Sequence, residues 1–221
     1  MNTASSDLTQ PCQARDFAEW HRGCPWCAVW LLWLDLPPVQ GRVISVRAAL
    51  QPWLLPQYAR QPHVTLAYRG LQSAGAAHPA AEFGVKQLSR DLEALEALKL
   101  QPWHIRLQGA GSFSTVPYLG VEDDGALAAV HAALAPVPLW ADWQYVPHVT
   151  LGHYGTAVPM SEVQTCLDRA VQDQAPMTVR VEHIWLARYR THDIAGPLTL
   201  EGCWDLRQQR YVPQQGALLR P

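Results

Sequence analysis

One five-residue segment, PHVTL, occurs twice in this chain, at residues 62–66 and again at residues 147–151. Each copy has a histidine and a threonine two positions apart, so on a β-strand both side chains point to the same face. The valine and the leucine of each copy point to the opposite face, where they can pack into a core. The repeat therefore predicts two strands that each present one imidazole and one hydroxyl on a polar face.

The two polar faces combine His63 with Thr65 and His148 with Thr150. Because the unperturbed pKa of histidine is about 6.5, one imidazole can accept a proton near neutral pH while another donates one. Threonine hydroxyls donate hydrogen bonds to anionic oxygens without adding charge. The set contains neither the paired carboxylates of a glycosidase or metal site nor a serine or cysteine beside a base. It suits in-line attack on a phosphodiester, with each histidine contributing roughly 10²–10⁴-fold in rate.

Strands and helices that interleave along the chain must bring the two copies together. Apolar runs predict strands over residues 26–34, 62–69, 103–108, 116–122, 147–154, 178–188 and 197–206. Apolar spacing and flanking proline or glycine predict helices over residues 7–22, 40–51, 84–99, 124–135 and 160–171. The order does not form strict βαβ units and several strand pairs look antiparallel, so we expect an α+β fold of two similar lobes.

The paired motifs, His63–Leu66 and His148–Leu151, resemble those of the two-histidine (2H) phosphoesterase superfamily. Within it the chain is most similar to the RNA 2′,3′-cyclic phosphodiesterases, also called the 2′-5′ RNA ligase family. The similarity covers about residues 24–206 and includes HVTLAYRG, the GAGSF turn before VPYLGV, and HVTLGHY. It implies a bilobal, pseudo-two-fold fold in which two antiparallel sheets face a central cleft and the helices lie outside.

The resemblance also implies an activity and a set of site residues. Family members open 2′,3′-cyclic phosphates to 2′-phosphates without a metal, and some join or cleave 2′-5′ linkages. The histidine of the first motif donates a proton and that of the second accepts one. One departure is that a histidine stands where the family often has an arginine, three residues after the second threonine. The implied residues are catalytic His63 and His148, and substrate-binding Thr65, Thr150, Phe113 and His153.

We therefore expect a metal-independent cyclic phosphodiesterase, with 2′-5′ RNA ligase activity as a further property of the family. Its substrates would be RNA ends or small cyclic nucleotides, and neither a metal nor a cofactor is expected. Two alternatives stay open: a phosphodiesterase for ADP-ribose 1″,2″-cyclic phosphate, and an RNA-end-binding protein without turnover. The missing arginine favours the second alternative.

Composition sets limits on the class of protein. The hydrophobic fraction of 48% and charged fraction of 16% exclude a disordered chain. A net charge of −2 argues against a protein that coats long nucleic acid. No apolar run approaches the roughly 18–20 residues of a membrane span, and the polar N-terminus does not resemble a secretory signal. We expect a cytoplasmic monomer with a helical extension (1–23), one bilobal domain (24–206) and a tail (207–221).

The pair Cys24 and Cys27 forms a C-x-x-C motif, which could indicate a thioredoxin-like redox site. Such a site follows a strand and opens a helix, whereas this pair precedes a predicted strand. A zinc site needs four ligands, and the other cysteines, Cys12, Cys166 and Cys203, are scattered. We therefore expect neither redox chemistry nor zinc binding at this motif.

Four residues in or near the repeats carry further predictions. His148 and His153 are five positions apart, so on a regular strand they face opposite sides and would not share a metal ion. Tyr68 and Tyr154 follow the two motifs. Either tyrosine could stack on a base or pack into the core.

Overall fold

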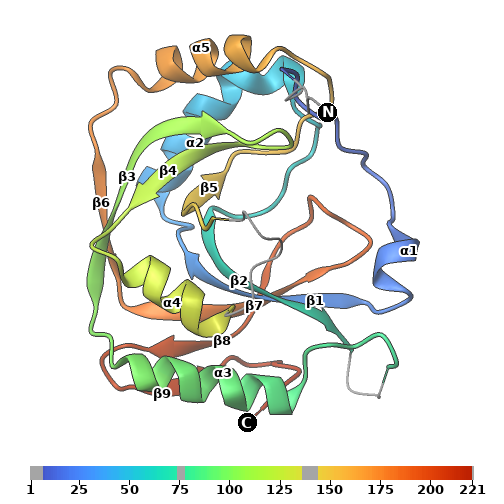
Figure 1. The fold of residues 1–221 in the computed structure, drawn as a ribbon, viewed down its shortest axis with the longest axis vertical. Coiled ribbons are helices and arrows are strands. Elements are labelled where there is room, and N and C mark those ends of the chain that lie inside the picture. Colours follow the sequence, from blue (N-terminus) through green and yellow to red (C-terminus); the bar gives the residue numbers. More distant parts are fainter. Residues whose placement is uncertain (1–6, 74–77, 136–143, 221) are drawn as a thin grey trace, which may run out of the picture.

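The computed structural model describes residues 7–73, 78–135 and 144–220 (Figure 1). Its helices are α1 (Ala18–His21), α2 (Pro37–Leu50), the 3₁₀ helix η1 (Gln51–Trp53), α3 (Val85–Leu98), α4 (Ala126–Leu134) and α5 (Met160–Val171). Its strands are β1 (Trp26–Trp33), β2 (His63–Gln72), β3 (Trp103–Ser112), β4 (Pro117–Glu122), β5 (His148–Thr150), β6 (Met177–Val181), β7 (His183–Arg190), β8 (Thr199–Asp205) and β9 (Arg210–Pro213). No helix in this part of the chain is long and apolar enough to cross a bilayer.

All strands pair antiparallel in the order β6-β3-β4-β5-β2-β1-β7-β8-β9. The central connection, between β5 and β2, is a single residue pair, Val64 with Val149. The sheet therefore consists of two halves that meet at the repeated segment. The α+β class and the antiparallel two-lobed fold are confirmed, with the difference that the two expected sheets join through this one pair.

Helices α2 and α4 each follow a strand of one half of the sheet but pack with elements of the other half. Helix α2 follows β1 in the chain, yet it packs with α5, which in turn packs on β3 in the other half. Helix α4 follows β4, yet it packs on β2 and α3. Figure 1 shows α2 and α5 together at one end of the molecule and α3 and α4 together at the other. This reciprocal exchange relates the two halves as a pseudo-two-fold arrangement requires.

Strand β1 is apolar along its whole length because both of its faces are covered. Ala28, Trp30 and Leu32 point into the main core between the sheet and the helices. Val29 and Leu31 point to the other face, into a smaller cluster. We call this smaller cluster the β1–β7 cluster; its buried members are Val29, Leu31, Ala187 and Leu198, and Trp33, Trp185, Tyr189 and Leu200 pack against it.

Helix α3 follows its predicted apolar stripe but also buries one carboxylate. Leu88 and Leu95 are buried, and Asp91 lies between them on the same face. The Asp91 carboxylate accepts hydrogen bonds from the Trp30 indole (2.7 Å) and from Arg69 Nε and Nη2 (both 2.8 Å). A buried charge needs such partners, so this network fixes α3 on the sheet.

The predicted N-terminal helix is wrong in extent. The structure has only the short α1 within residues 7–22, because Pro11 lacks an N–H and cannot lie in a helix interior. The segment before α1 is not helical, and its backbone N–H groups bond to the segments that follow β3 and β5. Thr9 donates to the Val158 carbonyl (2.8 Å), Gln10 to Ser114 (2.7 Å) and Cys12 to Tyr154 (2.7 Å).

Two strand predictions also need correction. The strand expected over 147–154 ends at Thr150, because Gly152 has φ +152°, a backbone conformation that other residues rarely adopt. The strand expected over 178–188 is two strands, β6 and β7, which pair at different places in the sheet, with β3 and β1. Residues expected to form a tail contain β9, which pairs with β8.

Candidate active site

The two H-x-T motifs lie side by side at the centre of the sheet. The Val64–Val149 pair is antiparallel, so in register His63 lies opposite Thr150 and Thr65 lies opposite His148. Both valines are fully buried in the main core. The alternating strand geometry therefore places the two imidazoles and two hydroxyls together on the opposite face, which we call the H-x-T face.

Each imidazole is held by the backbone in the same way. Nδ1 of His63 lies 2.7 Å from the Gln61 carbonyl oxygen, and Nδ1 of His148 lies 2.7 Å from the Val146 carbonyl oxygen. A carbonyl only accepts, so Nδ1 of each ring carries the proton and donates it. In the neutral rings Nε2 is then an unprotonated acceptor, and neither Nε2 bonds to another residue of the described chain.

The site favours neutral imidazoles. Burial lowers the pKa of His63 to about 4, and the positive charges of Arg60 and His148 act in the same direction. Burial also lowers the pKa of His148, against a smaller opposing effect of its hydrogen bond to Val146. The charge of His148 reaches His63, as expected for two rings on one face. Both histidines are therefore neutral at pH 7 before any ligand binds.

The two threonine hydroxyls complete the H-x-T face. Thr65 lies opposite Leu31 of β1, and Thr150 lies opposite Tyr118 of β4. Within the described residues neither hydroxyl forms a hydrogen bond to another group. Both are therefore available as donors to a ligand oxygen.

Phe113 and an aromatic residue that the sequence did not single out pack around His148. The Phe113 ring meets the His148 ring edge-on at 5.1 Å between centroids, and Tyr118 lies 5.3 Å from His148 and 4.6 Å from Phe113. The structure thus brings Phe113 to the second motif. Tyr118 could have been found from its place in VPYLGV, since a strand partner of the second motif must direct alternate residues to the same face.

The remaining predicted residue, His153, lies beyond the end of β5. Its ring packs edge-on against Tyr58 at 5.5 Å, and its Nδ1 is buried without a hydrogen-bond partner in the described chain. Burial and the charge of Arg60 lower its pKa to about 4. The two tyrosines after the motifs differ: Tyr154 is buried and its hydroxyl lies 2.6 Å from Ser112 Oγ, whereas Tyr68 is exposed.

The cysteine motif has the features of a structural pair. Cys24 and Cys27 are buried, and Cys27 belongs to β1 itself. Burial raises the pKa of the Cys27 thiol to about 11, the opposite of the shift that a reactive thiolate needs. Among the residues that the structure describes, no three His, Cys, Asp or Glu side chains gather as metal ligands.

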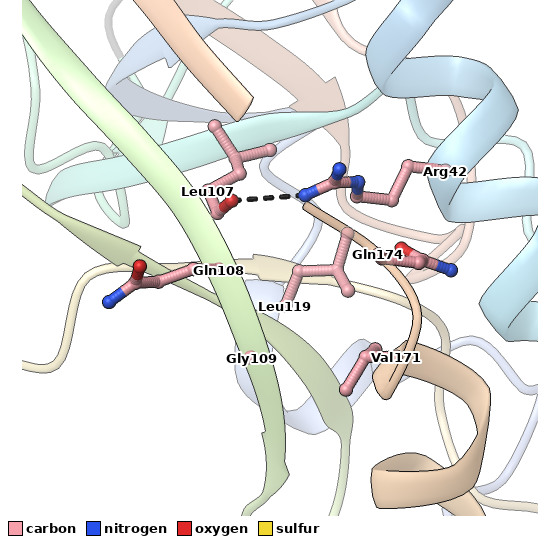
Figure 2. Close-up of a pocket in the computed structure, with 7 residues that line it drawn as sticks. All are labelled: Arg42, Leu107, Gln108, Gly109, Leu119, Val171 and Gln174. Carbon is pink, nitrogen blue, oxygen red and sulfur yellow. Dashed lines mark hydrogen bonds between the residues drawn. The ribbon is translucent and has the colours of Figure 1, made fainter. Parts of the chain in front are cut away.

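A small cavity lies away from the H-x-T face, between α2, β3 and the end of α5 (Figure 2). Arg42 reaches into it and donates a hydrogen bond to the Leu107 carbonyl oxygen (3.0 Å). Leu119 and Val171 form its apolar wall. None of the motif residues lines it, so it does not contribute to the candidate site.

A known crystal structure, that of TT0787, shares this fold. No curated protein matches the sequence. The crystal structure of TT0787 of Thermus thermophilus is similar with a TM-score of 0.54 and 18% identity, over 82% of this chain and 98% of that one. The crystal structure of E. coli LigT complexed with 3′-AMP gives a TM-score of 0.49 and 18% identity, over 86% and 96%.

A family model also matches most of the chain. Its description is the 2′-5′ RNA ligase superfamily, and the match spans residues 36–193. That span runs from the start of α2 to beyond β7 and contains both H-x-T motifs. This chain therefore belongs to the 2′-5′ RNA ligase superfamily, the two-histidine phosphoesterases.

Proposed function

We propose that this protein is a metal-independent phosphoesterase that hydrolyses 2′,3′-cyclic phosphate ends of RNA or nucleotides to 2′-phosphates. Membership of the superfamily gives the coarser class, a phosphoesterase or a ligase. The finer proposal rests on one observation. His63 and His148 share a face, each donates Nδ1–H to a backbone carbonyl, and each keeps Nε2 free of other residues in the described chain.

Both histidines have the same tautomer, so Nε2 of each ring is the atom that transfers a proton: His148 accepts one, and protonated His63 donates one. Nε2 of His148 accepts a proton from water, and the water oxygen forms a bond to phosphorus. The bond between phosphorus and O3′ breaks, and O3′ takes a proton from Nε2 of the protonated His63. The products are a 2′-phosphate monoester and a free 3′-hydroxyl, and one proton has moved from His63 to His148. Proton exchange with solvent then restores both rings.

Substrate must bind before His63 can act as the acid. In the empty protein the pKa of His63 is about 4, so the ring is almost entirely neutral at pH 7. A phosphodiester anion beside the ring favours the imidazolium and raises this pKa. Binding of the anion thus supplies the protonated form of His63.

The threonine hydroxyls act as uncharged hydrogen-bond donors to the substrate phosphate. Thr65 and Thr150 lie across the two strands, so each hydroxyl can donate to one nonbridging oxygen. Hydrogen bonds that hold these oxygens stabilise the charge that develops in the transition state. The Phe113 and Tyr118 rings beside His148 offer an aromatic surface for the base of the substrate.

Hydrolysis of 2′,3′-cyclic AMP in the presence of EDTA tests the proposal, with the product identified by phosphorus NMR. We expect 2′-AMP from the natural protein, and a loss of at least about 10²-fold in kcat/KM for His63→Ala and for His148→Ala. His104→Ala is the matched control, because His104 is exposed on β3, which pairs with β4 and β6 and not with either motif strand. A 3′-phosphate product, binding without turnover, or activity retained in the double variant would overturn the proposal.

A further inference from the structure

Arg60 is partly buried and, unlike Arg69 and Arg188, has no carboxylate partner in the described chain. Arg69 forms two hydrogen bonds to Asp91, and Arg188 pairs with Glu201. Arg60 makes one hydrogen bond, from Nε to the Gly196 carbonyl oxygen (3.2 Å), and no ion pair within the described residues. Both terminal nitrogens lack a hydrogen-bond partner there, and Nη2 is buried.

The guanidinium of Arg60 lies on the same side of the sheet as the H-x-T face. Its central carbon is 4.3 Å from the centroid of the Tyr189 ring, which packs against the β1–β7 cluster. That cluster includes Leu31 and packs against Trp33, the β1 partners of Thr65 and His63. Paired residues of neighbouring strands project to the same face, so Arg60 and the two motif residues share it.

The titratable groups on which the charge of Arg60 acts carry no negative charge at pH 7. Its charge acts on five titratable groups, which come from β1, β2, β7 and two connecting segments: Cys27, Tyr58, His63, His153 and Tyr189. Burial raises the pKa values of the thiol and of both phenols, and lowers those of both imidazoles to about 4. All five groups are therefore neutral at pH 7.

In a partly buried guanidinium, a buried nitrogen without a hydrogen-bond partner or a paired charge is costly unless an anion joins it. Backbone and side-chain donors left unpaired in a folded protein call for such an explanation. The reaction proposed above brings a phosphodiester anion to the neighbouring imidazole of His63. A guanidinium fork matches two phosphate oxygens, and a hydrogen bond between charged partners is about twice as strong as a neutral one.

We propose that Arg60 is the cationic ligand of the substrate phosphate, with its terminal nitrogens donating to the nonbridging oxygens. This inference rests on the proposed function. Arg60 adds the positive charge that the two neutral histidines and the two threonine hydroxyls lack. Arg60 holds the ground-state anion and stabilises the additional charge of the pentacoordinate transition state. It lies three residues before the first motif, in the irregular segment that leads into β2.

The test compares Arg60→Gln and Arg60→Lys with the natural protein. The probes are inorganic phosphate and 2′-AMP, whose dissociation constants are measured by titration calorimetry at pH 7. We expect Arg60→Gln to raise both dissociation constants by at least about tenfold. Arg60→Lys should restore part of the affinity, because lysine keeps the positive charge but lacks the planar guanidinium that binds two oxygens at once. The NMR titration of His63 should move upwards in Arg60→Gln, because a positive charge that lowers its pKa is gone.

Arg47→Gln is the matched control. Arg47 likewise lies over a tyrosine ring, that of Tyr58 at 5.3 Å, and donates to the Tyr58 carbonyl oxygen, but it does not act on His63. The Arg47→Gln variant should therefore bind phosphate as the natural protein does. Lower thermal stability of Arg60→Gln with unchanged phosphate affinity would mean that Arg60 is only structural, and would overturn the inference.

The outcomes separate this inference from the proposed function. If the natural protein hydrolyses the cyclic nucleotide while Arg60→Gln binds phosphate normally, the role of Arg60 is refuted and the function stands. If the natural protein binds phosphate through Arg60 but hydrolyses nothing, the anion site stands and the hydrolytic function is refuted.

Discussion

The burial of His63 makes a prediction about folding that does not depend on any substrate. His63 is 8% exposed, and burial lowers its pKa from 6.5 to about 4. The unfolded chain therefore binds more protons than the folded protein between these two values. Stability that is present above pH 6.5 must decrease as the pH falls towards 4.

The size of the effect follows from the two pKa values. A difference of about 2.5 pKa units corresponds to about 3 kcal/mol when it is fully expressed, below the folded pKa. Between pH 7.5 and pH 5 the part expressed is about 2 kcal/mol. His153, whose pKa is also lowered to about 4, adds a similar amount.

Urea unfolding at pH 7.5 and at pH 5 measures this difference. We expect His63→Gln to lose about 2 kcal/mol less than the natural protein between the two pH values, because glutamine does not titrate. His104→Gln, with an exposed side chain on β3, should lose as much as the natural protein. If His63→Gln showed the same pH dependence as the natural protein, His63 would not be a buried neutral imidazole and the reasoning would be wrong.

Three further substitutions test single features of the structure. Thr150→Val removes a hydroxyl from the H-x-T face, so kcat/KM should decrease by about tenfold or more while the urea midpoint stays within error; full activity would contradict its role. Thr9→Val removes hydrogen bonds to Thr156 (2.8 Å) and from Val158 (2.9 Å), and calorimetry should show a loss of about 1–3 kcal/mol, whereas an unchanged unfolding temperature would deny the N-terminal segment a structural role. Asp91→Asn leaves the Arg69 charge without its carboxylate and should destabilise the protein by about 3 kcal/mol in urea, a result that a change below about 1 kcal/mol would refute.

The centre of the fold could be predicted from local sequence because its signals are local. The two PHVTL copies define their own polar and apolar faces, and the structure buries Val64 and Val149 as alternation requires. The leucine spacing of α3 likewise predicts its buried face. These signals depend only on the period of a strand or a helix.

Other parts could not be predicted because they depend on distant partners. The sequence of residues 178–188 does not indicate that β6 and β7 pair with different strands, because apolar residues alternate in both. Residues 7–12 contain few apolar side chains, and their backbone bonds to a loop far along the chain fix them instead.

Arg60 shows the same limit within the candidate site. It lies in an irregular segment outside both motifs, and in the sequence it is one arginine among many. What distinguishes it is a buried Nη2 without a hydrogen-bond partner in the described chain, on the same side of the sheet as both motifs; this depends on β1, β7 and the segment that follows β5 all folding together. Such an unpaired donor is a property of tertiary structure.

A crystal structure with a bound nucleotide 2′-phosphate tests the central claim most directly. The account predicts one phosphate between the two motifs, with Nε2 of His63 and Nε2 of His148 each about 2.6–3.2 Å from a phosphate oxygen. A phosphate bound elsewhere on the protein, or one reached by only one of the two imidazoles, would contradict it.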